Sequence, residues 1–202
     1  MKVIIEVPNT GLFPYQFVQM WPLMMFTAQQ KGIDISYNLR MGSLIYDARE
    51  CAAKKLLESD ADAVLFLDSD MVPSADMLVK LVEHNKPIVT ALAFKRVPPY
   101  TPCIFKHISK KEATVYTDYP KELTQIEACG MACCLIKREA FEKIPQPWFT
   151  PSNDFGEDLL FCLRAKQAKI PIFCDTTLIC KHVSSYEVGE EHYASRLSLS
   201  QE

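Results

Sequence analysis

The sequence predicts an α/β fold, with a mixed but mostly parallel sheet flanked by helices. Apolar segments of strand length alternate with segments of helical period along most of the 202 residues, as expected when helices connect neighbouring parallel strands. Residues 63–67 form an unbroken apolar run, which is typical of a central strand buried on both faces. The chain contains no Gly- or Ser-rich linker and no internal repeat, and its length suits one domain. We therefore expect a single domain over 1–202.

In the first half, the spacing of apolar residues and the positions of turn formers predict each element. The expected elements, in chain order, are a strand over 2–7, a helix over 18–31, a strand over 34–38, a helix over 45–58, a strand over 63–67, a helix capped by Ser74 and a strand over 87–92. The first strand stops at Pro8-Asn9-Thr10-Gly11, a turn sequence. Ile45, Ala48, Ala52 and Leu56 recur at helical spacing in the second helix.

At a proline-rich segment, 98–102, the alternation of strands and helices gives way to a series of short strands. Short strands follow, expected over 103–108, 113–117, 123–128 and 131–136, then helices over 138–144 and 156–168 and strands over 170–174 and 177–180. We expect the first of these strands to form an antiparallel or mixed region. The polar segment 186–202 is expected to be a mobile tail.

Composition excludes several classes of protein. A formal net charge of -3 argues against a large basic nucleic-acid footprint. The eight cysteines show no zinc-like spacing and mostly lie in apolar runs, which favours reduced, buried thiols in a cytoplasmic protein. The longest apolar stretch, 17–28, is too short to span a bilayer and contains Gln19 and Pro22. We expect a cytoplasmic protein without a membrane segment.

The strongest chemical signal is the sequence Asp68-Ser69-Asp70 directly after the buried strand 63–67. Ligands of open α/β sheets bind beyond the carboxyl ends of strands. Residues i and i+2 of an extended chain point to one side, so the two carboxylates can share a divalent cation. An acidic pair that only ends a strand and caps the next helix is the structural alternative.

The segments 47–50 and 62–76 together resemble GT-A fold glycosyltransferases, in particular small phage and bacterial members near family 2. The resemblance extends in order to 130–141, 155–162 and 174–182, and so covers roughly residues 45 to 182. It implies a GT-A (Rossmann-like) fold, with 1–95 as a nucleotide-binding half and 96–185 as an acceptor half that also supplies a metal-binding histidine.

By this resemblance, the first half binds the donor, a nucleotide-diphosphate sugar. Arg49 matches the Arg of an Ala-Arg-Asn sequence that helps to hold the nucleotide, although Glu50 stands here in place of the Asn. Asp68 and Asp70 match a motif that holds Mn²⁺ or Mg²⁺ on the donor diphosphate. Ser69, between them, would also contact the donor.

The same resemblance gives roles to residues of the second half. His182 would be a metal ligand, and Gly130 and Met131 would contact the acceptor. Asp158 would be the general base of an inverting transfer, with Glu157 beside it. Two acids at a helix start are also explained by the helix dipole alone, and retaining GT-A enzymes share these landmarks, so the stereochemical outcome is open.

The remaining candidates carry weaker signals and are, in chain order, Pro8, Asn9, Thr10, Lys95, Arg96 and Trp148. The first three end a strand where the family places base and ribose contacts, but turn formers occur there in any fold. The basic pair follows another strand and could reach phosphates, or could simply be solvated. The indole could stack on an acceptor, although an aromatic residue under a loop is more often packing.

The predicted function is metal-dependent transfer of a sugar, with a UDP-sugar favoured as donor, to a hydroxyl of a saccharide, a protein or a modified DNA base. One alternative is a haloacid-dehalogenase-like phosphatase, because residues 65–72 superficially fit its nucleophile motif. A second is a sugar-nucleotide-binding module without activity. A sugar nucleotidyltransferase would need a Gly-rich phosphate loop, which 7–11 does not provide.

Overall fold

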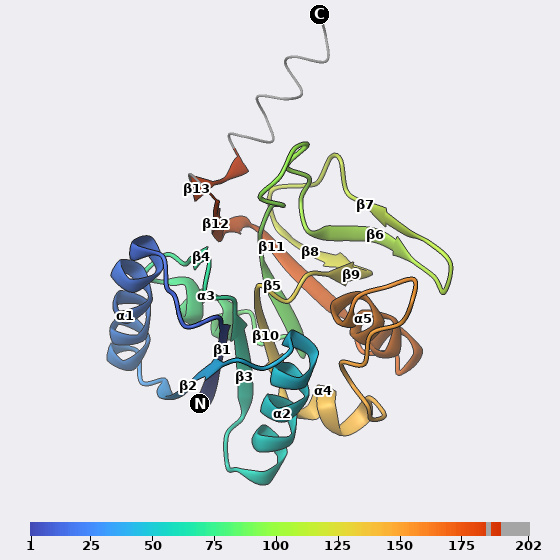
Figure 1. Ribbon diagram of the computed structural model, residues 1–202. Coiled ribbons are helices and arrows are strands. Elements are labelled where there is room, and N and C mark those ends of the chain that lie inside the picture. Colours follow the sequence, from blue (N-terminus) through green and yellow to red (C-terminus); the bar gives the residue numbers. More distant parts are fainter. Residues whose placement is uncertain (185–186, 191–202) are drawn as a thin grey trace, which may run out of the picture.

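The computed structural model describes residues 1–184 and 187–190, and its centre is a seven-stranded sheet of order β2-β1-β3-β10-β5-β11-β8 (Figure 1). The helices are α1 (Tyr15–Gln30), α2 (Ile45–Glu58), α3 (Met77–Glu83), α4 (Arg138–Lys143) and α5 (Glu157–Gln167). The strands are β1 (Lys2–Asn9), β2 (Asp34–Met41), β3 (Ala63–Leu67), β4 (Met71–Val72), β5 (Ile88–Leu92), β6 (Ile104–Ile108), β7 (Ala113–Val115), β8 (Leu123–Ile126), β9 (Ala128–Cys129), β10 (Cys133–Lys137), β11 (Ile172–Ile179), β12 (Lys181–Val183) and β13 (Glu187–Val188).

The central sheet is mixed, as predicted. β1 pairs in parallel with β2 and β3, and β5 pairs in parallel with β11. β10 lies antiparallel between β3 and β5, and β8 is antiparallel to β11 at one edge. Because β3 and β5 are both antiparallel to β10, they run in the same direction, and β8 and β10 are the two strands that oppose the other five.

Two apolar cores lie on opposite faces of this sheet. Buried residues of α1 and α3 pack on one face against alternate residues of β1, β3, β5 and β10. Buried residues of α2, α4 and α5 pack on the other face. Alternation explains why both faces are covered, because successive side chains of a strand point to opposite sides. The unbroken apolar run of β3, buried at all five positions, serves both cores.

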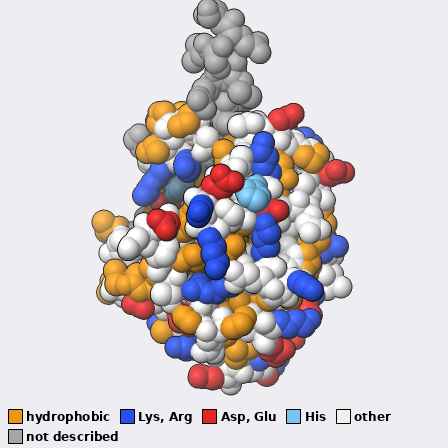
Figure 2. Space-filling model, turned by 90° about the vertical axis from the view of Figure 1, so that its right-hand side faces the viewer, with side chains coloured by type: hydrophobic (Ala, Val, Ile, Leu, Met, Phe, Trp, Pro, Cys, Tyr) orange, Lys and Arg blue, Asp and Glu red, His pale blue; other side chains and the backbone are white. Residues whose placement is uncertain are grey.

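Two small sheets extend the domain. β6, with β7 and β9 beside it, forms one of them, and β12 joins β4 to β13 in the other. Figure 2 shows the side of the molecule that is on the right in Figure 1, where Lys and Arg side chains are scattered among acidic and apolar ones. This face therefore carries no continuous basic surface.

The structure corrects three details of the predicted elements. The expected strands 170–174 and 177–180 form one strand, β11, with a shift of register between Asp175 and Ile179. The expected strand 123–128 divides into β8 and β9, which belong to different sheets. Ser74 does not cap α3 because its hydroxyl donates to Asp76 Oδ1 at 2.6 Å and α3 begins at Met77.

Two further expectations concern the ends of the chain and the membrane. The expected mobile tail over 186–202 lies largely outside the described residues, which include only 187–190 of it. Within the described ranges, no helix is both long and apolar enough to cross a bilayer.

Candidate active site

Asp68 begins the site at the carboxyl end of β3. Its backbone N–H donates to the carbonyl of Ala132 at 2.9 Å, immediately before β10 pairs with β3 at Cys133 and Leu67. This contact fixes where the extended chain leaves the sheet. The carboxylate of Asp68 therefore stands at the edge where α/β folds bind their ligands.

Arg49 ties three elements together at this edge. Three buried apolar residues of α2, namely Ala52, Ala53 and Leu56, pack in the core on this face of the sheet, and the Arg49 side chain on the same helix is 4% exposed. Its Nη2 donates to Asp68 Oδ1 at 3.1 Å, and its Nη1 donates to Glu157 Oε1 on the first turn of α5. The guanidinium therefore holds both carboxylates, and its buried Nε–H has no acceptor among the described residues.

Asp70 and His182 form a second charged group. β12 pairs with β4, with His182 opposite Met71, and this brings His182 Nε2 to 3.1 Å from Asp70 Oδ2. Arg96 Nη1 lies 2.7 Å from the same oxygen. Burial raises the pKa of Asp70, but the hydrogen bond and charge of His182 and the charge of Arg96 outweigh it, so the pKa lies below its ordinary value. Burial lowers the pKa of His182, but the contact with Asp70 outweighs it, and the pKa is raised.

The other nitrogen of His182 defines what this pair can bind. Nδ1 lies 3.0 Å from the carbonyl of Phe94, an acceptor, so Nδ1 carries a hydrogen. In the neutral ring, Nε2 is then a lone-pair acceptor facing a carboxylate oxygen. Two acceptors at this distance need a proton or a cation between them. Adjacent ligands of an octahedral ion at about 2.1 Å lie about 3 Å apart, so the pair fits two positions around a divalent ion.

The pair is small for a complete metal site. Among residues 1–184 and 187–190, no group of three or more His, Cys, Asp and Glu side chains is arranged to hold an ion. A cation at Asp70 and His182 would therefore take its other ligands from a bound substrate or from water. Mg²⁺ sites that use one or two carboxylates together with substrate phosphates have this character.

Asp158 lies on the first turn of α5, beside Glu157. Its Oδ1 accepts a hydrogen bond from the Leu159 N–H at 2.7 Å, whereas Oδ2 lies 3.8 Å from the position that a Cβ of Gly130 would take. Burial is the main reason that the pKa of Asp158 is raised, and Arg49 only partly offsets it. The pKa of Glu157 is raised by burial too, with Arg49 opposing and the charge of Asp158 adding to the shift. A partly buried carboxylate with a raised pKa is a suitable proton acceptor.

Most of these groups line one cavity of about 270 Å³; Asp70 is not a lining residue but contacts one, His182. Its lining comprises Ile45, Arg49, Asp68, Thr90, Ala91, Ala93, Cys103, Gly130, Met131, Ala132, Cys133, Glu157, Asp158 and His182. The cavity thus has an Arg-carboxylate cluster, an imidazole and a partly buried acid, Asp158, and the rest of its wall consists mainly of apolar and small residues. Converging polar groups in a concave apolar setting are typical of a ligand site.

Comparisons with known proteins identify the architecture. No protein-family model and no curated protein sequence matches the chain. Among solved structures, A197 from STIV superposes with a TM-score of 0.62 at 20% identity, over 91% of this chain and 86% of that one. GalNAc-T7, a GT-A glycosyltransferase solved with UDP, GalNAc and Mn²⁺, superposes with a TM-score of 0.59 at 10% identity, over 91% of this chain and 43% of that one. The protein has the GT-A fold.

The predicted donor residues lie in four places in this GT-A fold. Arg49 and Asp68 line the cavity. Ser69 lies in the turn between Asp68 and Asp70 and is partly buried. Pro8 and Asn9 do not form the expected turn but are the last two residues of β1, paired with β2. Asn9 Oδ1 accepts from the Gly11 N–H at 2.9 Å, and neither these two residues nor Thr10 line the cavity. Lys95 and Arg96 are exposed and follow Phe94, and of the two only Arg96 contacts the site, through Asp70.

Of the three residues expected to contact the acceptor, two line the cavity and one is buried away from it. Gly130 and Met131 line the cavity, but the expected stacking of Trp148 on an acceptor is wrong. The Trp148 side chain is 1% exposed, packs edge-on against Phe141 at 5.4 Å and donates from Nε1 to the carbonyl of Ile144 at 2.8 Å. It therefore presents no surface to a ligand.

Several lining residues had no recognisable signal in the sequence. Thr90 and Cys103 are examples: Thr90 lies within β5 and donates to the carbonyl of Cys133 at 3.0 Å, and Cys103 follows the proline-rich segment. Burial raises the pKa of the Cys103 thiol to about 12, so it lines the cavity as a neutral group. Glu50, which replaces the expected Asn, faces away from this chemistry and accepts from the N–H groups of Trp148 and Phe149.

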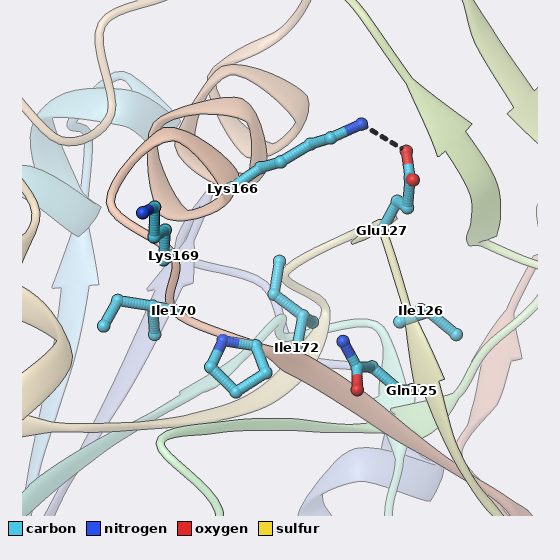
Figure 3. Close-up of a pocket in the computed structure, with 8 residues that line it drawn as sticks. Gln125, Ile126, Glu127, Lys166, Lys169, Ile170 and Ile172 are labelled. Carbon is cyan, nitrogen blue, oxygen red and sulfur yellow. Dashed lines mark hydrogen bonds and ion pairs between the residues drawn. The ribbon is translucent and has the colours of Figure 1, made fainter.

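A second cavity, of about 250 Å³, lies elsewhere between β8, α5 and the start of β11 (Figure 3). Its one acid, Glu127, already accepts from Lys166 at 2.7 Å and from the Ile108 N–H at 2.7 Å. Apolar side chains such as Ile170 and Ile172 form much of the remaining wall. This cavity lacks the opposing acid and metal-type groups of the first, and we assign it no catalytic role.

Proposed function

We propose that the protein is a metal-dependent glycosyltransferase that moves a sugar from a nucleotide-diphosphate donor to a hydroxyl acceptor with inversion. The observation that carries this proposal is the arrangement around one cavity of a GT-A fold. There His182, which is paired with Asp70, and a separate, partly buried carboxylate, Asp158, line the same space. Asp70 and His182 would hold the cation that compensates the charge of the departing diphosphate, and Asp158 would remove the proton of the acceptor hydroxyl.

Asp70 and His182 would hold Mn²⁺ or Mg²⁺, with Asp68 beside them as a further carboxylate toward the metal or the donor. When bound, the ion compensates the negative charge that develops on the departing diphosphate. The hydrogen bond from His182 Nδ1 to Phe94 supports this role, because it keeps the Nε2 lone pair available. The exposed side chain of Arg96 forms an ion pair with Asp70. When donor binds, this guanidinium would bind a donor phosphate in place of the Asp70 carboxylate.

Asp158 would act as the general base. The acceptor oxygen forms a bond to the anomeric carbon, the bond from that carbon to the diphosphate oxygen breaks, and the acceptor proton passes to Asp158. Its Oδ2 is the available atom, because Oδ1 already accepts from Leu159. Glu157 would serve with Arg49 as a positioning pair, since the guanidinium fixes Glu157 and Asp68 together.

The remaining donor and acceptor contacts follow from position. Pro8, Asn9 and Thr10 at the end of β1, together with Ser69 and Lys95, would complete the donor site, and Gly130 and Met131 would form part of the acceptor wall. A UDP-sugar is the favoured donor, supported by the UDP in the GalNAc-T7 structure. Acceptors to be compared are saccharides, proteins and hydroxylated bases in DNA.

A donor screen tests the proposal. UDP-, GDP- and dTDP-sugars are incubated with the protein with and without Mn²⁺, and both binding and release of the nucleoside diphosphate are measured. Metal-dependent turnover that is lost in Asp158→Asn supports a transferase. Tight metal-dependent binding without turnover on any acceptor class would instead identify a binding module, and metal-dependent hydrolysis of an aryl phosphate would favour the phosphatase.

A further inference from the structure

The N-terminal part of the chain carries an unusual concentration of exposed apolar side chains. Of the eleven large hydrophobic residues exposed in the described part of the chain, ten lie within 1–44. No charged residue occurs between Glu6 and Lys31, so α1 has none. Surface helices normally carry charged residues on their outer face, and a contiguous exposed apolar patch usually marks an interaction site.

One stripe of α1 continues this surface onto the edge of the sheet. Val18, Trp21, Pro22 and Met25 are spaced i, i+3, i+4 and i+7 and so share one side of the helix. The Trp21 ring meets the Tyr37 ring of β2 edge-on at 5.2 Å. The apolar stripe of α1 therefore lies next to β2.

β2 itself separates its side chains cleanly by face. Its odd-numbered residues on the α1 side are Ile35, Tyr37, Leu39 and Met41, and its even-numbered residues on the other side are Asp34, Ser36, Asn38 and Arg40. Tyr37 and Met41 are 56% and 69% exposed. A strand with this alternation is built to have one face buried, and in this chain that face is only partly covered.

β2 is also the last strand of the central sheet, paired on one side with β1. An edge strand presents unpaired backbone N–H and C=O groups. A lipid environment cannot satisfy such groups, whereas a strand from another chain can. The open edge therefore favours a β-strand as the occupant over a membrane surface.

The sequence of β2 is complementary to itself in one antiparallel register. If Tyr37 of one copy faces Tyr37 of the other, residues whose numbers sum to 74 lie opposite each other. Asp34 then faces Arg40, Ile35 faces Leu39, and Ser36 faces Asn38, each twice. Among the described residues, the Asp34 carboxylate accepts no hydrogen bond, and Arg40 uses only Nε, toward Glu6. Opposite charges and matched apolar pairs across strands stabilise an antiparallel pair.

We propose that two copies of this chain associate through their β2 edges, antiparallel about a two-fold axis at Tyr37, to form one continuous sheet with the apolar sides of α1 packed across the junction. Such an interface is isologous and closes on itself, so it yields a dimer rather than a filament. The candidate active site, at the carboxyl ends of the strands, is not part of this surface and stays accessible.

Sedimentation velocity of the full chain over a micromolar concentration series tests association. We expect a dimer for the parent and a monomer for Tyr37→Lys, which places two ammonium groups at the axis. Asp34→Lys should weaken dimerisation roughly tenfold, because it replaces two attractive pairs by repulsive ones, whereas Lys31→Glu on the helix end should leave it unchanged. Far-UV circular dichroism must show the same fold for each variant.

Crosslinking tests the register. In a Cys51→Ser background, which removes the exposed native thiol, Tyr37→Cys should form an intermolecular disulfide on mild oxidation, since opposite residues are about 4.5–5.5 Å apart at Cα. Leu39→Cys is the matched control and should not, because its counterpart is four residues away along the strand. A monomeric parent, equal crosslinking of both variants, or a monomer whose Tyr37 mediates liposome binding would overturn the proposal.

Discussion

Asp158→Asn should reduce turnover while leaving the protein folded and able to bind donor. The amide keeps the shape of the side chain, and its oxygen can still accept from the Leu159 N–H, which lies 2.7 Å from Oδ1. Only the ability to take a proton is lost. Removing a general base typically lowers the rate by about 10² to 10⁴, so we expect kcat to fall in that range with little change in donor KM.

The same substitution should raise stability at neutral pH. Burial raises the pKa of Asp158 above its ordinary value of 3.8, which means that the folded state disfavours the charged form. The stability of the parent is therefore greatest when Asp158 is protonated and falls as the pH rises through the unfolded and then the folded pKa. An amide has no such penalty. A carboxylate retained only for the helix dipole would show the opposite sign, a loss of about 0.3–1 kcal/mol on substitution.

Steady-state kinetics, thermal unfolding and NMR of the glycoside product form the assay. The parent should show an acid limb in its kcat/KM profile that rises with pH through the raised pKa, and the product should have the anomeric configuration opposite to that of the donor. Asp154→Asn, an exposed acid in the loop before α5, is the matched control and should behave as the parent does. Near-normal turnover in Asp158→Asn, or a product with retained configuration, would refute the reasoning.

Three further experiments have distinct expected results. His182→Ala should weaken Mn²⁺ binding in a calorimetric titration without abolishing it, whereas Asp70→Asn should abolish it; an unchanged titration in both would remove the metal assignment. Arg49→Met should cost about 3–5 kcal/mol in urea unfolding, because it leaves two carboxylates uncompensated, and adding Glu157→Gln should recover part of that loss. Trp148→Phe should cost about 1–3 kcal/mol by stranding the carbonyl of Ile144 with no specific loss of acceptor binding; a raised acceptor KM at unchanged stability would return Trp148 to the site.

Much of the architecture was predictable because its signals are local. The apolar run of β3, the helical spacing in α2 and the acidic start of α5 each depend on residues close in sequence, and all three elements lie within a residue of the expected bounds. The sequence Asp68-Ser69-Asp70 was recognisable for the same reason, since it follows directly on a strand that must be central. Order along the chain then predicted the GT-A fold, which the structural comparisons confirm.

Contacts between distant segments could not be predicted in this way. Arg49 and Glu157 are 108 residues apart, and neither residue type indicates which partner it will meet. The same holds for Cys103 in the cavity wall and for Trp148, for which the sequence left both stacking on an acceptor and packing under a loop open. In the fold, aromatic packing around Phe141 buries that indole because the apolar area removed from water outweighs the cost of ordering the loop.

The sequence by itself thus determined the order of the main helices and strands, the alternation of buried and exposed faces and the position of the acidic motif at a strand end. Tertiary structure alone decided which carboxylate Arg49 holds, that β12 brings His182 to Asp70, and that β2 is left as an open edge with an apolar face. The physical reason is range: periodicity and turn chemistry act over a few residues. Ion pairs, cavities and sheet edges depend on how segments far apart in the chain pack together.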